Sequence, residues 1–180
     1  MERQLSLEVR PADATRLDEL ADVAARTFPL ACPPSCTPDD IAAFIAGNLT
    51  PDRFADYLGD PDRTVFTAIE DDRILGYAML IAGVPDDPDV AAAVTARPAV
   101  ELSKMYVLPD AHGAGASAAL MSAALQHAAS TAAASTWLGV NQKNVRAQRF
   151  YRKHGFEVTG TKTFRVGAHL EEDYVMVRPV

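Results

Sequence analysis

The stretch from Glu101 to Met121 constrains the fold more than any other part of the chain. Its first half, which includes Met105 to Val107, has the composition of a β-strand and ends before a proline that cannot continue a ladder. Its second half is rich in Ala and Leu, which favour a helix. A strand, a glycine turn and a helix in this order direct backbone N–H groups and the positive end of a helix dipole toward one point. The sequence therefore predicts a site for phosphate or pyrophosphate around Gly113 and Gly115.

Other interpretations of this turn require features that the chain does not supply in full. A Walker loop needs Lys-Ser or Lys-Thr after the second glycine, and neither is present. The run from Gly113 to Ala118 matches the dinucleotide-binding pattern G-x-G-x-x-A, but those glycines follow their strand directly and an acidic residue closes the next strand. Here residues 108–112 intervene, and the next predicted strand ends in Asn141. A helix start that tolerates glycine and holds no ligand is the remaining alternative.

A second motif occupies a predicted helix that follows the next strand and ends at a glycine. Its pattern is Asn-x-x-Ala-x-x-Phe-Tyr-x-x-x-Gly-Phe, matched by Asn144, Ala147, Phe150, Tyr151, Gly155 and Phe156. Singly these residues are a helix cap, core side chains and a helix stop. As a set, placed one strand after a glycine anion loop, they are specific.

The two motifs together resemble the GCN5-related N-acetyltransferase (GNAT) family. Val-x-Pro followed by His112 to Ser117 and Leu120 is similar to that family's acetyl-CoA loop, Arg/Gln-x-x-Gly-x-Gly/Ala, whose backbone amides cradle the CoA pyrophosphate. The chain departs from the pattern at His112 and at Ser117. The resemblance extends from about Val100 to Val166, and it is weaker toward the N-terminus.

The resemblance implies an α/β protein with the GNAT fold. In that fold a mixed, mostly antiparallel central sheet is flanked by helices, with a parallel strand-helix-strand crossing at the acetyl-CoA site. The crossing is expected between the strands around Met105 and Leu138. The co-substrate implied is acetyl-CoA, with no metal. The residues that would bind it are Met105, Tyr106, Val107, His112, Gly113, Ala114, Gly115, Ala116, Ser117, Asn144 and Phe150.

Acetyl transfer to an amine needs a neutral amine, a donor for the oxyanion and a proton for the leaving thiolate. Tyr151 stands where the family keeps its general acid, and Glu101 stands where it often places a base that acts directly or through water. An amphipathic core tyrosine and an ordinary polar strand residue are the alternatives for these two positions. Asp173 and Glu70 are weaker candidates for the base. Neither cysteine is required, because transfer can be direct.

The acceptor is less constrained than the cofactor. The formal net charge is −7, which opposes nucleic-acid binding and favours cationic small molecules. Glu-Leu-Ser-Lys-Met-Tyr-Val, Trp-Leu-Gly-Val-Asn and the terminal Asp-Tyr-Val-Met resemble the polyamine (spermidine/spermine) N-acetyltransferase branch. Seven acids are expected around the acceptor cleft: Asp39, Asp40, Asp52, Asp56, Asp86, Asp87 and Asp89.

Other functions remain open at this stage. They are an acetyltransferase of peptide N-termini or amino acids, and a degenerate acyl-CoA-binding sensor that has lost catalysis. In the family the region from Phe28 to Tyr57 covers the acceptor site.

The rest of the chain predicts a conventional series of elements. A helix capped by Asp13 is expected to end at the proline-rich loop 29–38, and two further helices begin at Thr37 and Thr50. Strands 64–69 and 74–82 form a hairpin, residues 83–98 a long loop, and strands 164–166 and 174–177 a second hairpin. A first strand contains Leu5, Leu7 and Val9.

Length and composition indicate a single N-acetyltransferase domain covering residues 1–180. The longest apolar stretch is Ile74 to Val84, and the charged N-terminus does not resemble a signal peptide. We therefore expect a cytoplasmic protein with a small-molecule amine substrate and no nucleic-acid or membrane partner, with homodimerisation left open. Cys32 and Cys36 are interpreted as ordinary loop residues.

Overall fold

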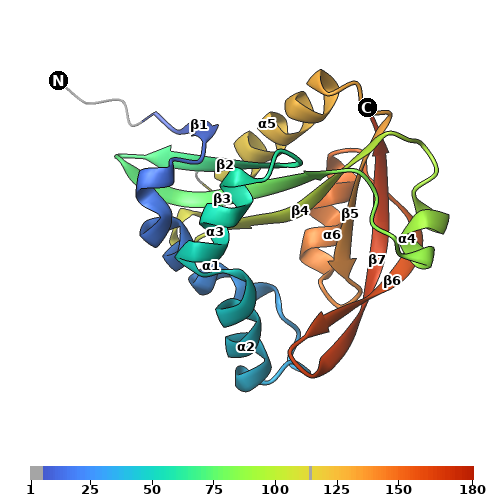
Figure 1. Ribbon diagram of the computed structural model, residues 1–180, viewed down its shortest axis with the longest axis horizontal. Coiled ribbons are helices and arrows are strands. Elements are labelled where there is room, and N and C mark those ends of the chain that lie inside the picture. The colour runs from blue at the N-terminus through green and yellow to red at the C-terminus, as the bar shows by residue number, and fades with distance from the viewer. Residues whose placement is uncertain (1–5, 114) are drawn as a thin grey trace.

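A seven-stranded mixed sheet organises the computed structural model, which describes residues 6–113 and 115–180 (Figure 1). The strand order is β1-β2-β3-β4-β5-β7-β6, and β4 and β5 form the parallel pair among antiparallel neighbours. The expected α/β class and mixed sheet are confirmed. The strands are β1 (Glu8–Pro11), β2 (Arg63–Glu70), β3 (Arg73–Ala82), β4 (Ala99–Val107), β5 (Ser135–Asn141), β6 (Glu157–Val166) and β7 (His169–Pro179).

The parallel pair is short. It joins Ala99–Glu101 of β4 to Ser135–Trp137 of β5, and beyond these residues the two strands have no common register. The parallel crossing expected between the strands around Met105 and Leu138 is confirmed, because β4 contains the first residue and β5 the second. At the same level the β3–β4 register shifts, so that Ser103 has no Cα partner on β3. This β-bulge and the separation of β5 leave the second half of β4 open on one side.

Helices cover both faces of the strands β2 to β4. The helix α5 (Ala116–Ser130) packs on one face, and α1 (Leu17–Ala31) with α3 (Pro51–Gly59) packs on the other (Figure 1). The run from Ile74 to Leu80 on β3 is continuously buried, as expected for a strand covered on both faces. The remaining helices are α2 (Pro38–Asn48), α4 (Pro88–Ala93) and α6 (Val145–Lys153), with short 3₁₀ turns at Ala14–Arg16 and Pro109–Ala111.

Side-chain caps fix where several helices begin. Thr37, Thr50 and Asn144 accept hydrogen bonds from backbone N–H groups in the first turns of α2, α3 and α6. Asp13 caps the 3₁₀ turn before α1, and Asp87 caps α4. These interactions are local, which explains why the predicted starts of α2 and α3 are confirmed.

Four expectations differ from the structure. The first strand, β1, begins at Glu8, so it contains Val9 but not Leu7. Helix α1 continues past Pro29 to Ala31, so the proline lies within its last turn and does not end the helix. The loop 83–98 contains the short helix α4, and the C-terminal hairpin is longer than predicted at both strands. Leu5 and Ala114 lie outside the described residues. No helix within the described ranges is long and apolar enough to cross a membrane.

Candidate active site

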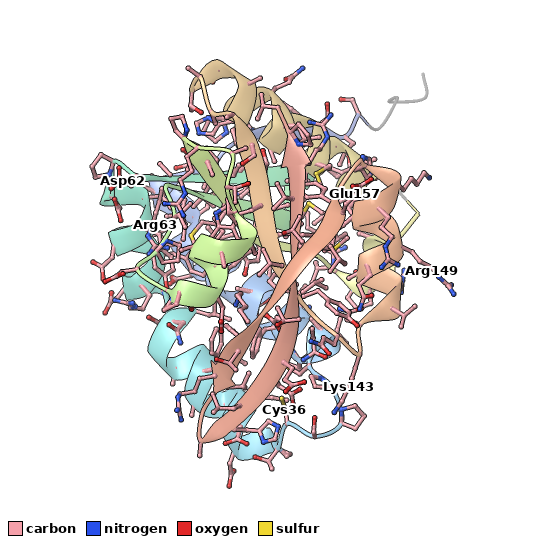
Figure 2. All side chains as sticks on the ribbon, turned by 90° about the vertical axis from the view of Figure 1, so that its right-hand side faces the viewer. Cys36, Asp62, Arg63, Lys143, Arg149 and Glu157 are labelled. Carbon is pink, nitrogen blue, oxygen red and sulfur yellow. The ribbon has the colours of Figure 1, made fainter. Side chains whose placement is uncertain are left out.

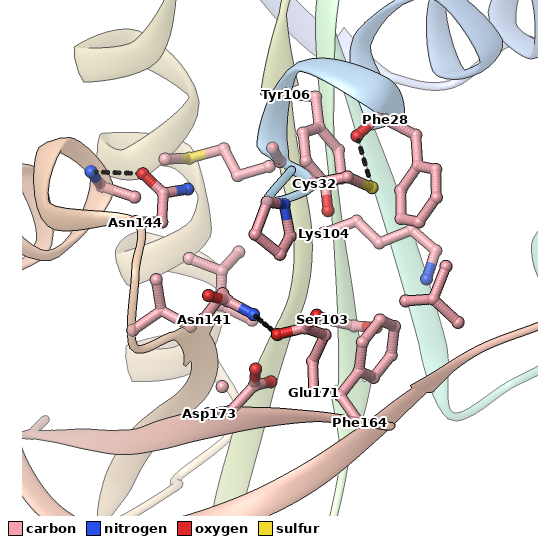
Figure 3. A pocket seen from close by; sticks show the side chains of 18 of the residues that line it. Phe28, Cys32, Ser103, Lys104, Tyr106, Asn141, Asn144, Phe164, Glu171 and Asp173 are labelled. Atoms are coloured by element: carbon pink, nitrogen blue, oxygen red, sulfur yellow. Dashed lines mark hydrogen bonds between the residues drawn. The ribbon is translucent and has the colours of Figure 1, made fainter. Parts of the chain in front are cut away.

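A cavity of about 240 Å³ opens where β4 and β5 separate (Figure 3). Its walls come from the end of α1 and the loop after it, α2, β4, β5, α6 and the β6–β7 hairpin. Six consecutive residues of β4, Glu101 to Tyr106, line it. An unbroken strand would turn every second side chain away, so this lining reflects the bulge at Ser103 and the missing β5 partner.

Tyr151 reaches the cavity from α6, and Asn144 lies at the start of the same helix. The Asn144 Oδ1 accepts a hydrogen bond of 3.1 Å from the Ala147 N–H, which fixes the beginning of the helix. The Tyr151 ring packs edge-on against Phe150 and Phe156. Burial raises the pKa of Tyr151 to about 12, so the phenol keeps its proton at neutral pH.

Two charged side chains of β4 face the cavity. Burial raises the pKa of Glu101, while the positive charges of Lys162, Lys104 and Arg63 oppose that shift. Burial also lowers the pKa of Lys104 to about 8, and the Glu101 carboxylate partly offsets the effect. The Lys104 Nζ lies 5.9 Å from the centroid of the Phe44 ring.

A buried ion pair lies at the base of the β6–β7 hairpin. The Lys162 Nζ lies 3.4 Å from the Asp173 Oδ2, and the Asp173 side chain is almost fully buried. Both side chains line the cavity. Burial raises the pKa of Asp173, whereas Lys162 lowers it. Gly139 of β5 leaves room for this pair, because a Cβ there would collide with the Lys162 side chain.

Glu171 ties three parts of the cavity wall together. Ser35 Oγ donates to its Oε1 at 2.6 Å, Asn141 Nδ2 donates to its Oε2 at 3.1 Å, and His169 Nε2 lies 2.7 Å from Oε1. These hydrogen bonds, the strongest from Ser35, lower the pKa of Glu171 to about 2. Lys143 Nζ also donates to Ser35 (3.3 Å).

The two cysteines lie in the same region. Cys36 is buried with its Sγ 3.8 Å from a Glu171 oxygen, beside the β6–β7 hairpin (Figure 2). Cys32 lines the cavity and donates a hydrogen bond to the Phe28 carbonyl. Burial raises the pKa of the Cys32 thiol to about 12, so it is a protonated, weak nucleophile. No group of three or more potential metal-ligating side chains occurs within residues 6–113 and 115–180.

An aromatic wall closes the cavity opposite α6. Phe28 and Phe44 stack with centroids 4.3 Å apart, and Phe164 meets Phe44 edge-on at 5.6 Å. The first two rings belong to the segment 28–57 that was expected to cover the acceptor site, and the third comes from β6. The wall is apolar except for the charged ends of Lys104 and Lys162.

The predicted anion loop lies beyond the end of β4, outside the cavity lining. Gly113 and Gly115 have φ of 92° and 83°, a left-handed conformation that strongly favours glycine. Gly115 precedes α5 without a side-chain cap, and the first turn of that helix carries no acidic residue. The first backbone N–H groups of α5 are therefore available to an anion.

His112 connects this loop to α6. Its Nε2 is 3.1 Å from the Val107 carbonyl oxygen, and its Nδ1 is 3.3 Å from Arg146 Nη2. A carbonyl only accepts and a guanidinium only donates, so the ring is protonated on Nε2. The imidazole thereby holds Arg146 beside the loop.

The structure gathers only part of the predicted site around the cavity. The predicted residues in its lining are Glu101, Met105, Tyr106, Asn144 and Tyr151. Those outside the lining are Val107, His112, Gly113, Gly115, Ala116, Ser117 and Phe150, and Ala114 is not among the described residues. Of the weaker candidates, Asp173 lines the cavity and Glu70 does not.

The seven surface acids expected around the cleft are not part of the cavity wall. None of Asp39, Asp40, Asp52, Asp56, Asp86, Asp87 and Asp89 lines the cavity. Several have local roles instead: Asp87 caps α4, Asp56 pairs with Arg53, and Asp40 accepts from the Ala168 N–H. The carboxylates that do line it are Glu101, Glu171 and Asp173.

Comparison with known proteins agrees with this geometry. The model of the acetyltransferase (GNAT) family matches residues 18–156. The chain belongs to the GNAT family. It is thus an acetyl-CoA-dependent N-acetyltransferase, as the two motifs predicted. An uncharacterized N-acetyltransferase of Mycobacterium tuberculosis is 60% identical over 164 residues, which cover 91% of this chain and 97% of that protein.

Solved structures share the fold of this GNAT chain at low sequence identity. The PaiA N-acetyltransferase of Thermoplasma acidophilum, in complex with coenzyme A, has a TM-score of 0.76 at 17% identity, covering 98% of this chain and 100% of its own. A ribosomal-protein-alanine N-acetyltransferase of Brucella melitensis has a TM-score of 0.70 at 18% identity, covering 96% and 99%. At such identities the likeness concerns the fold.

Proposed function

We propose that this enzyme transfers acetyl from acetyl-CoA directly to the primary amine of a small molecule, in the cavity between β4 and β5. The observation that carries the proposal is the position of Tyr151 and Glu101. A phenol and a carboxylate line one cavity at the point where two parallel strands separate. A volume of about 240 Å³ suits a small acceptor better than a folded protein surface.

The acetyl-CoA side of the site is proposed along β4 and α5. The uncapped α5 N-terminus and the amides from Gly113 to Ser117 would hold the pyrophosphate. Backbone groups of Met105 to Val107, which have no β5 partner, would pair with the pantetheine arm. Arg146, positioned by His112, adds a cation next to the phosphates.

The proposed roles in acetyl transfer follow from charge and burial. Glu101 attracts the acceptor ammonium and takes its proton, directly or through water, because burial has raised the pKa of this carboxyl. Ser103, which has no partner on β3 or β5, offers its backbone N–H to the oxyanion. Tyr151 hydrogen-bonds the departing thiolate and passes it a proton. The protonated Cys32 thiol disfavours an acetyl-cysteine route.

Tyr151→Phe tests this assignment. The variant should bind acetyl-CoA in calorimetry with unchanged affinity, while kcat falls by about 10²–10⁴-fold in a thiol-release assay. Tyr174→Phe is the matched control, because that ring on β7 lies outside the cavity lining.

A loss below about threefold would move the proton donor to another group. A protein that binds acetyl-CoA and releases no CoA with any amine would instead be a sensor, and the proposal would be wrong.

A further inference from the structure

Two charged groups of the cavity wall are left without a partner. Within the part of the chain that the structure describes, neither Glu101 nor Lys104 makes a hydrogen bond or an ion pair, and they do not contact each other closely enough to form one. Lys162 is paired with Asp173, and Glu171 is bonded to three neighbours, Ser35, Asn141 and His169. One carboxylate and one ammonium thus remain for a ligand.

The surroundings of Lys104 indicate what it should bind. Its side chain runs past Tyr106 toward Phe28, on the other side of the pocket from Asp173 (Figure 3). The nearby rings of Phe28 and Phe44 offer only weak compensation for a desolvated ammonium. A partly buried charge without a partner is unfavourable, and an anionic group of a ligand would remove that cost.

We propose that the acceptor is a zwitterion, an amino acid with an apolar side chain. Its amino group would lie at Glu101, its carboxylate at Lys104, and its side chain against the rings of Phe28, Phe44 and Phe164. This inference rests on the proposed acetyl transfer and specifies its substrate. The amine nitrogen forms the new bond to the acetyl carbon, and the C–S bond breaks. The acceptor ammonium first gives one proton to Glu101, which leaves a neutral amine. As the amide forms, the nitrogen loses a second proton, which replaces through water the proton that Tyr151 gives to the sulfur. The product is an N-acetyl amino acid that keeps its carboxylate.

A polyamine fits these charges less well. Its second ammonium would approach Lys104, where like charges repel in a region of low polarity. The seven surface acids that could have attracted a polycation are not part of the cavity lining. Charge complementarity therefore favours a zwitterion over a dication.

Matched acceptors test the inference. The panel is phenylalanine, phenylalaninamide and phenethylamine, with the same series for leucine, and spermidine. For the wild type at pH 7, kcat/KM for each amino acid should exceed that of its amide and its decarboxylated amine by about tenfold or more. Lys104→Met should reduce this ratio to below about threefold, and Lys104→Arg should retain most of it.

The control variant is Lys143→Met, which removes an exposed positive charge bound to Ser35 outside the cavity lining. It should leave the ratio within threefold, and calorimetry with acetyl-CoA checks that each variant is folded. The zwitterion assignment is wrong if amides, simple amines or spermidine match the amino acids, or if Lys104→Met leaves the ratio unchanged. In those cases acetyl transfer itself stands. Failure to acetylate any amine, with acetyl-CoA bound, overturns the proposed function and this inference together.

Discussion

Glu171→Gln should destabilise the protein at neutral pH and much less at acid pH. The Glu171 carboxylate is nearly inaccessible and accepts hydrogen bonds from Ser35 and Asn141, with His169 also in contact. Together they lower its pKa from 4.5 to about 2. Glutamine has the same shape and keeps some of these contacts, so the substitution chiefly removes charge.

The sign and size of the effect follow from this shift in pKa. Because the folded pKa is the lower one, the stabilisation is fully present above the unfolded pKa of 4.5 and is lost as pH falls toward 2. This lowering of the pKa corresponds to about 3 kcal/mol of the free energy of unfolding at pH 7. The contribution falls to roughly 1 kcal/mol at pH 3 and to less than about 0.5 kcal/mol at pH 2.

Urea unfolding followed by tryptophan fluorescence provides the measurement. Trp137, the single tryptophan, is buried on β5 and reports the global transition. The free energy of unfolding should be compared between wild type and Glu171→Gln at pH 3, 4, 5.5 and 7. Glu172→Gln, which removes an exposed carboxylate from the next position on β7, is the control. If the difference between wild type and Glu171→Gln does not shrink from pH 7 to pH 3, packing rather than charge is responsible and the reasoning is refuted.

The remaining predictions concern the catalytic and cofactor sides of the site. Glu101→Gln should lower kcat and remove the acidic limb of the pH–rate profile, which burial places above the ordinary carboxyl range; an unmoved limb would make Glu101 structural. Gly115→Val should weaken acetyl-CoA binding in calorimetry by at least about tenfold. The control Gly83→Val changes another left-handed glycine, remote from the loop, and should leave the affinity unchanged. Equal affinities of Gly115→Val and wild type for acetyl-CoA would contradict the loop assignment. Arg146→Met should raise the Kd for acetyl-CoA several-fold and reduce its salt dependence, with Arg152→Met as control, and an unchanged salt dependence would exclude a phosphate contact.

The features that sequence reasoning identified depend on neighbours in the chain. Helix starts at Thr37 and Thr50 require only a capping side chain, a proline and the following N–H groups. Helix α4 begins with the same signals, Asp87 and Pro88, so the sequence contained enough to predict it. The glycine turn before α5 is likewise local.

The missed features depend on which distant segments meet. Alternation along β4 does not predict that Lys104 shares a cavity with Glu101, because the bulge at Ser103 and the loss of β5 appear only once strands are paired. Glu171 contacts Ser35, which is 136 residues away in the chain. The amino-acid composition gives the number of acidic residues. It does not show that Glu101, Glu171 and Asp173 line the cavity while the other acids lie elsewhere.

The aromatic wall and the acetyl-CoA side belong to separate stretches of the chain. Phe28, Phe44 and Phe164 stand outside the segment 101–151 that carries the anion loop and Tyr151. Preference for the acceptor's apolar side chain can therefore diverge during evolution while the donor half of the reaction stays intact. For the same reason, a library randomised at these three positions should yield enzymes with new acceptors that still consume acetyl-CoA.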